Sequence, residues 1–214
     1  MVGGLDKLRT KLGSPILIGA VAALVAAGCD RPAVAGGRSP ADKPAVGMKI
    51  DSILPPGEAL RRFQAELTPV SALEDAPRGR DALVMKFIKA LERADTAALE
   101  NLVLSKAEYG FLYFPTSVYS RKPYELHPDI AWLLNDQNGQ KGSIRLLRRL
   151  GGHALQFGGY TCGTPVSEQD NVFWRDCEVK YVDPASTRQV TRKLFGTIME
   201  RGDRYKFLSY ANDF

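Results

Sequence analysis

The amino-acid sequence predicts an α+β fold in which N-terminal helices pack on a curved, cone-like sheet of four antiparallel strands in meander order. Two patterns lead to this prediction. Apolar residues recur at helical spacing up to Gly152, and apolar and polar residues alternate beyond it, as in strands. Short turn-forming segments separate the alternating runs, which favours a meander over crossover connections.

Composition limits the number of domains and the class of partner. The chain has 214 residues, 44% of them hydrophobic and 25% charged, which suits one domain with a core and appended segments. Lysine and arginine number 29 and the acidic residues 24. This excess is too dilute to indicate a nucleic-acid-binding protein, so we expect no nucleic-acid partner.

The first 28 residues have the pattern of an export signal. Lys7, Arg9 and Lys11 precede an uncharged apolar run over residues 15–27. As a helix at about 1.5 Å per residue this run is about 20 Å long, shorter than the roughly 30 Å hydrocarbon core of a bilayer. Export followed by cleavage therefore explains the segment better than a membrane-spanning helix does.

The sequence Ala26-Ala27-Gly28-Cys29 follows this run and resembles the lipobox of bacterial lipoproteins. The resemblance implies a signal peptide over residues 1–28 and a lipid, with palmitate among its acyl chains, on the sulfur of Cys29. Asp30 resembles the signal that retains lipoproteins at the inner membrane. We therefore expect a lipid-anchored envelope protein that faces the periplasm or the exterior. Cleavage after residue 35 and retention as an uncleaved anchor are the alternatives.

Two further cysteines agree with an oxidising compartment. Cys162 and Cys177 lie in neighbouring predicted strands, and a hairpin turn near residues 169–170 sets them opposite each other. We expect them to form a structural disulfide. Metal-ligand spacing such as C-x-x-C does not occur, so the sequence predicts neither a metal nor a cofactor.

The remaining elements follow in chain order. Residues 29–56 are rich in proline, glycine and alanine and predict a flexible tether, and residues 57–214 predict a single domain. Helical spacing predicts helices over residues 57–67, 80–94, 96–104, 128–137 and 140–150. Alternation predicts strands over residues 155–162, 172–182, 189–201 and 205–210.

Residues 105–127 hold the richest aromatic segment of the chain, punctuated by glycine and proline. One interpretation is a long loop that closes the core. The other is an aromatic lining for the mouth of a pocket, with Tyr109, Phe111 and Tyr113 as its candidate residues.

Two segments resemble nuclear-transport-factor-2-like (SnoaL-like) domains. Residues 87–99 combine a long helix with a short one, and residues 202–207 lead from a turn into an aromatic last strand. The resemblance implies a cone-shaped fold whose interior binds a ligand or partner or, in the enzymes, holds proton-moving side chains. We assign no catalytic residue. His127 and His153 occupy loop positions, and Asp176 and Glu178 have the pattern of a solvated strand face.

These observations predict a membrane-tethered domain that binds a small apolar ligand or an envelope protein without catalysis. A small acid/base enzyme of the same fold is one alternative, and a buried acid near the aromatic segment would favour it. A structural subunit of an envelope complex is another, and it requires an exposed apolar sheet face around Trp174. A basic face at residues 141–149 is a candidate contact for anionic lipid headgroups.

Overall fold

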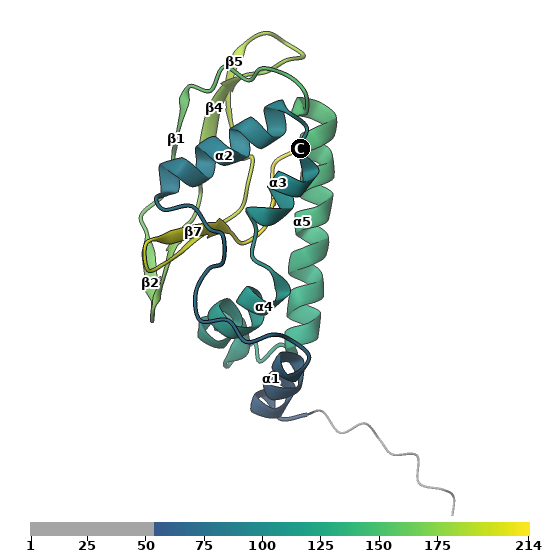
Figure 1. Ribbon diagram of the computed structural model, residues 1–214, viewed down its shortest axis with the longest axis vertical. Coiled ribbons are helices and arrows are strands. Elements are labelled where there is room, and N and C mark those ends of the chain that lie inside the picture. Colours follow the sequence, from purple (N-terminus) through teal and green to yellow (C-terminus); the bar gives the residue numbers. More distant parts are fainter. Residues whose placement is uncertain (1–53) are drawn as a thin grey trace, which may run out of the picture. The chain divides into compact units, whose positions relative to one another are not determined.

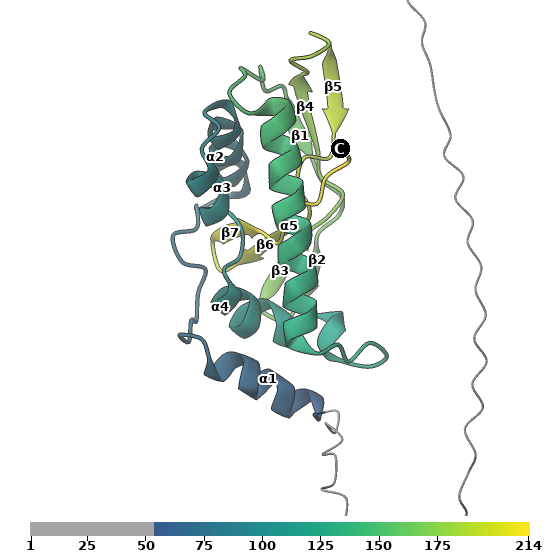
Figure 2. The same ribbon diagram turned by 90° about the vertical axis from the view of Figure 1, so that its right-hand side faces the viewer.

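The computed structural model describes residues 54–214 and shows an α+β domain in which helices cover two antiparallel sheets (Figures 1 and 2). The expected signal peptide, Cys29, Asp30 and all but the last residues of the expected tether lie outside this range. Within it, none of the helices combines the length and the apolar character needed to cross a membrane.

The helices precede the strands, as predicted. They are α1 (Pro56–Ala65), α2 (Arg80–Glu92), α3 (Thr96–Asn101), α4 (Lys106–Glu108) and α5 (Pro128–Leu150). The side chain of Asp95 caps α3 by accepting a hydrogen bond from Ala98 N. Ser105 and Glu108 form a capping box at the start of α4.

The aromatic segment between α4 and α5 is helical over much of its length, and the prediction of a long loop there is wrong. A π-helical turn (Tyr109–Tyr113) continues α4, and two 3-10 turns follow it (Phe114–Thr116 and Val118–Ser120). The two helices predicted over residues 128–150 are also one continuous helix, α5. Glycine disfavours helix by about 1 kcal/mol, but tertiary contacts override this preference at Gly139 and Gly142.

Within residues 54–214, seven strands form two sheets rather than the single four-stranded sheet predicted. The strands are β1 (Gly159–Thr161), β2 (Val166–Glu168), β3 (Asn171–Trp174), β4 (Glu178–Val182), β5 (Gln189–Arg192), β6 (Ile198–Arg201) and β7 (Arg204–Phe207). One sheet has the order β1-β4-β5 and the other β2-β3-β6-β7, with every pairing antiparallel.

Two of the predicted strands, residues 172–182 and 189–201, are each broken into two shorter strands that belong to different sheets. Asp176, at φ 52°, redirects the chain between β3 and β4. Leu194 and Phe195, both fully buried, turn into the core between β5 and β6. The predicted strands 172–182 and 189–201 are still neighbours, as in a meander, because β3 pairs with β6 and β4 pairs with β5.

The structure contains the disulfide between Cys162 and Cys177, fifteen positions apart in sequence. Thr161 pairs with Glu178, so the two cysteines continue the register of β1 and β4. A loop of this length contributes about 3 kcal/mol to stability by the chain-entropy estimate. The bridge closes the end of β1 and β4 beside the break at Asp176, where the two sheets separate.

The core consists of two apolar clusters. The larger lies under α2, where the ring of Phe87 is 5.3 Å from Phe195, 5.4 Å from Phe207 and 5.5 Å from Tyr210. The smaller lies under the π-helical turn and includes Tyr109, which is 2% exposed. Aromatic rings therefore fill the centre of both clusters.

The ring of Phe87 gives the first prediction. Phe87→Ala removes a fully buried ring that contacts three others, so it is expected to lower the free energy of unfolding by about 3–5 kcal/mol. Met85→Ala on the same helix, at a side chain 39% exposed, should change it by about 0.5 kcal/mol or less. Urea unfolding of both variants measures the difference, and equal effects would contradict the described core.

The C-terminal segment, residues 208–212, lies between α5 and α3. A Cβ atom on Gly142 would overlap the carbonyl oxygen of Tyr210. Asn212 Nδ2 donates to the Gly142 and Tyr210 carbonyls, both at 2.9 Å. On the other side, the Tyr210 hydroxyl donates to Leu99 O at 2.7 Å.

The two glycines of α5 give a matched pair of substitutions. Gly142→Ala forces the helix away from Tyr210 and is expected to destabilise the domain by about 1–3 kcal/mol. Gly139→Ala meets no atom closer than 3.7 Å and should stabilise the helix by up to about 1 kcal/mol. Thermal unfolding of the two variants checks the prediction, which fails if both shift in the same direction.

Candidate functional site

Two cavities lie on opposite sides of α5. The α3 cavity, about 420 Å³, lies between α3, α5 and the C-terminal segment. The tyrosine cavity, about 550 Å³, lies between the π-helical turn, α5 and the sheet that contains β3. Asn135 and Leu208 line both cavities, and Asn135 Nδ2 donates to Leu208 O at 3.0 Å. This hydrogen bond forms part of the wall between them.

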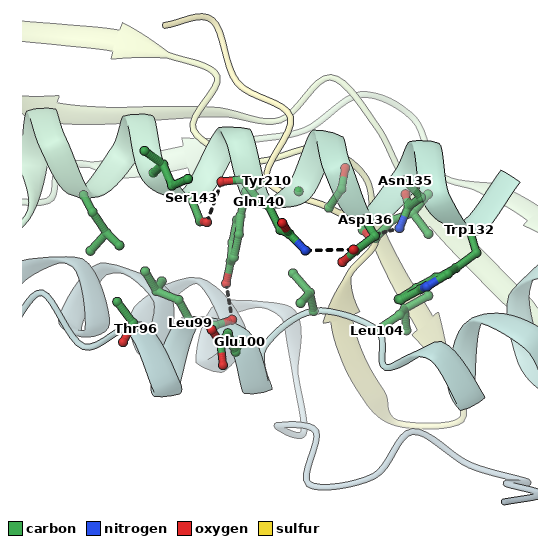
Figure 3. A pocket seen from close by; sticks show the side chains of 16 residues that line it. Thr96, Leu99, Glu100, Leu104, Trp132, Asn135, Asp136, Gln140, Ser143 and Tyr210 are labelled. Carbon is green, nitrogen blue, oxygen red and sulfur yellow. Dashed lines mark hydrogen bonds between the residues drawn. The ribbon is translucent and has the colours of Figure 1, made fainter. Parts of the chain in front are cut away.

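The α3 cavity is mainly apolar with an acidic rim (Figure 3). Its acids are Glu100 and Asp136, and none of the described residues that line it is basic. Gln140 donates to Asp136 at 2.8 Å, and the Tyr210 hydroxyl points across to the backbone of α3. Several of its polar groups are therefore already paired within the domain.

The tyrosine cavity has an aromatic floor that the π-helical turn positions. Tyr109 and Tyr113 stand on the same side of this turn, with ring centroids 5.1 Å apart. Tyr113 also meets Phe173 of β3 edge-on at 5.8 Å. Trp132 of α5 packs against Tyr109 at 5.1 Å. The rings of the floor thus come from the π-helical turn and β3, and Trp132, which lines the α3 cavity instead, packs against one of them.

The hydroxyls of Tyr109 and Tyr113 are open to the cavity. The two residues are 2% and 8% exposed, and neither hydroxyl has a hydrogen-bond partner among the described residues. Every fully enclosed polar side-chain atom of the described residues has a partner, so these two hydroxyl oxygens are not enclosed. Burial, followed by the nearby Tyr119 and Glu168, raises the pKa of Tyr113 to about 12. Burial also raises the pKa of Tyr109. Both hydroxyls are therefore protonated hydrogen-bond donors at neutral pH.

Polar and apolar side chains share the rim of this cavity. Glu168 of β2 accepts a hydrogen bond from Arg175 at 3.3 Å, and the Arg175 guanidinium lies over the ring of Phe173. Val118, Tyr119 and Leu134 are also at the rim and are 40–50% exposed. A ligand entering here meets aromatic and aliphatic surface first and the two tyrosine hydroxyls at the floor.

Two of the three candidate pocket residues thus lie together in one cavity. Phe111 belongs to the same turn but lines neither cavity, and it packs half-buried at the margin of the smaller core cluster. Glu168, Arg175 and Asn135 were not singled out from the sequence as site residues. No spacing pattern marks them, because they come from a strand, from the residue that follows another strand, and from a helix, which only tertiary packing brings together.

The domain does contain a buried acid near the aromatic segment, but its hydrogen bonds are occupied. Glu108, fully buried, accepts from Glu74 N at 2.7 Å and from Ser105 N at 2.8 Å, and Lys206 Nζ lies 2.9 Å away. Glu108 lines neither cavity. It ties α4 to β7 and is a structural residue.

The other polar candidates lie at the surface. His127 and His153 are exposed, as are Asp176 and Glu178. Within residues 54–214 there is no group of three or more histidine, cysteine or acidic side chains placed to hold a metal ion.

Trp174 does not present an exposed apolar sheet face. Its ring is half-buried, and the guanidinium of Arg80 covers it at 3.9 Å. Its indole nitrogen donates to Glu200 at 3.1 Å. The surface expected of a structural subunit is therefore not found around this residue.

The buried ion pair gives a further prediction. Lys206→Met leaves the Glu108 carboxylate buried without its counter-charge and is expected to cost about 3–5 kcal/mol of stability. Combining it with Glu108→Gln should recover part of this loss, because the uncompensated charge is removed. Urea unfolding of the single and double variants tests this, and strict additivity would contradict the coupling.

Comparisons of the chain with protein-family models, with curated proteins and with solved structures find no match in any of the three. The cavities and the sequence motifs are therefore the basis for assigning a function.

Proposed function

We propose that this protein is a lipid-anchored protein of the bacterial cell envelope whose domain binds a small, largely apolar ligand in the tyrosine cavity and catalyses no reaction. The observation that carries the proposal is a pair of buried tyrosine rings whose hydroxyls open into an aromatic cavity and have no hydrogen-bond partner among the described residues. A bound ligand can accept hydrogen bonds from these two donors.

The size and lining of the tyrosine cavity support binding. Its volume of about 550 Å³ falls in the range typical of small-molecule sites. Tyr109, Tyr113 and Phe173 offer ring surface for stacking, and the two hydroxyls offer directed donors. The preferred ligand has an apolar body and at least one oxygen that accepts hydrogen bonds.

The same residues favour binding over acid/base catalysis. Protonated tyrosines cannot act as general bases at neutral pH, and the raised pKa of Tyr113, about 12, keeps it in that form. The acid at the rim, Glu168, is paired with Arg175. The cavity therefore has hydrogen-bond donors for recognition and no free acid poised to move a proton.

The anchor and the compartment rest on the lipobox-like sequence before Cys29, and Asp30 favours the inner membrane. A tether over residues 29–56 gives the domain freedom to stand off the bilayer. The Cys162–Cys177 disulfide supports export to an oxidising compartment, where such bridges form and persist.

We further propose that the fold is a cone of the nuclear-transport-factor-2-like kind. Two chain segments, residues 171–182 and 189–201, each contribute a strand to both sheets, and this continuity is what a strongly bent sheet requires. Helices α2 and α3 precede the sheets in the order that the resemblance implies.

Binding is tested with the fluorescent probe 8-anilinonaphthalene-1-sulfonate, which has an apolar body and an anionic acceptor. Asn138→Trp at the rim of the tyrosine cavity is expected to weaken probe binding about tenfold or more by closing the site. Gln140→Trp is the matched control, because it places the same side chain on α5 beside the α3 cavity and should leave binding unchanged.

Tyr113→Phe separates a specific site from general adhesion to apolar surface. The variant keeps the ring and removes one donor, so probe affinity should fall about fivefold to tenfold. If probe binding is saturable and is weakened by Gln140→Trp but not by Asn138→Trp, the binding site is the α3 cavity instead. A probe that binds without saturation would contradict a ligand-binding domain.

A further inference from the structure

The α3 cavity lies between one face of α3 and one face of α5 (Figure 3). On α3 it is lined by Thr96, Glu100 and Val103, and on α5 by Asp136, Gln140 and Ser143. Both sets lie four and then three positions apart, the spacing with which two helix faces usually pack together. Here the two faces leave about 420 Å³ between them. The cavity is therefore bounded by two helices, which hold its side chains in place.

Most hydrogen-bond donors of this lining are used inside the domain. The amide nitrogen of Asn135 donates to a backbone carbonyl at 3.0 Å, and that of Gln140 donates to Asp136 at 2.8 Å. The hydroxyls of Ser143 and Tyr210 donate to backbone carbonyls at 2.9 and 2.7 Å. A ligand in this cavity therefore finds few free donors.

Acceptors remain open in the same lining. The side-chain oxygens of Asn135 and Gln140 accept no hydrogen bond from a described residue. Ser209 is 9% exposed, and its hydroxyl, which can accept or donate, has no partner among the described residues either. Every fully enclosed polar side-chain atom there has a partner, so the Ser209 hydroxyl is not enclosed. The cavity thus suits a ligand that brings its own donors.

The lining also carries unbalanced negative charge. Glu100 and Asp136 lie on opposite walls, one on α3 and one on α5 (Figure 3). Neither forms a salt bridge with another described residue, and none of the described lining residues is basic. Lys141 and Arg145 of α5 are close in sequence but do not line the cavity. Two carboxylates beside apolar walls attract a positively charged group.

Aromatic and apolar side chains form the rest of the lining. Trp132 is half-buried, and an indole ring attracts cations to its face more strongly than other aromatic rings do. Ile144 is 56% exposed and lies at the open side of the cavity with the half-buried Leu147. Leu99 and Tyr210 lie deeper, at 1% and 2% exposed. These surfaces suit an apolar body attached to a charged head.

We propose that the α3 cavity is a second ligand site, selective for an organic cation that carries a primary or secondary ammonium group on an apolar body. The carboxylates of Glu100 and Asp136 attract the ammonium group, which donates to the open acceptors, and the body contacts Trp132 and Ile144. The same carboxylates repel an anionic ligand. This site does not depend on the tyrosine cavity, whose open hydroxyls are donors and select the opposite chemistry.

Three probes with one body and different heads test this selectivity. 4-Phenylbutylamine carries an ammonium group, 4-phenylbutan-1-ol a hydroxyl and 4-phenylbutyrate a carboxylate. They are titrated by calorimetry into the full chain with Asn138→Trp, which closes the tyrosine cavity, and corrected by a blank titration into the same detergent buffer. The amine should show one saturable site, the alcohol should bind about tenfold more weakly or less tightly still, and the carboxylate should not bind measurably. Equal affinities for amine and alcohol would contradict a cation site.

Neutral variants of the two acids locate the site. In the same background, Glu100→Gln and Asp136→Asn should each weaken amine binding about threefold to tenfold and leave alcohol binding unchanged, which also shows that the cavity is folded. Asp129→Asn is the matched control, because it removes the same charge from α5 outside the cavity and should change neither affinity. An equal loss of amine affinity in Asp129→Asn would overturn the proposal.

Filling the cavity provides an independent test. Gln140→Trp should weaken amine binding about tenfold or more, with thermal unfolding of the variant as the folding control. Amine binding that is unchanged by Gln140→Trp would overturn the proposal. Failure at this site is distinguishable from failure at the tyrosine cavity, because the anionic dye reports on the latter in a separate titration.

Discussion

The approach of Gly142 to the backbone of Tyr210 is the contact on which the rest of the domain depends. With no Cβ at this position, α5 lies directly on residues 208–212, and Tyr210 in turn reaches Leu99 on α3. Three segments far apart in the sequence are thereby held together. The α3 cavity borders this contact through Tyr210, so the same packing that closes the core also shapes one of the two cavities.

The distribution of buried polar groups separates support from recognition. Glu108 and Lys206 use their hydrogen-bonding capacity on each other and on nearby backbone, which fixes the aromatic turn to the sheet. Tyr109, one residue further along, has an equally buried ring but an unused hydroxyl. A well-anchored scaffold with open donors at one place is the arrangement expected of a preorganised binding site.

Local patterns in the sequence predict the parts of the fold that local interactions decide. The apolar stripe of α2 and the opposed cysteines are both found in the structure, because periodicity and hairpin register follow from short-range geometry. The sequence does not predict that α5 is one continuous helix, because the glycines within it indicate a helix break. Only the close contact of Gly142 with Tyr210, which local sequence does not reveal, accounts for a glycine inside this helix. The breaks near Asp176 and Phe195 likewise depend on tertiary packing.

For the candidate site, the high number of aromatic residues in the sequence points to the segment that contains the π-helical turn. The conformation of this turn then places Tyr109 and Tyr113 in the cavity lining and leaves Phe111 outside it.

The proposed anchor, the tether and the class of ligand all depend on export to the envelope. Intact mass spectrometry of the protein from its native membrane, before and after reduction, tests this claim directly. We predict a chain that begins at Cys29, carries a diacylglyceryl group, and gains about 2 Da on reduction of the Cys162–Cys177 bridge. A chain without the lipid, or one with two free thiols before reduction, would contradict it.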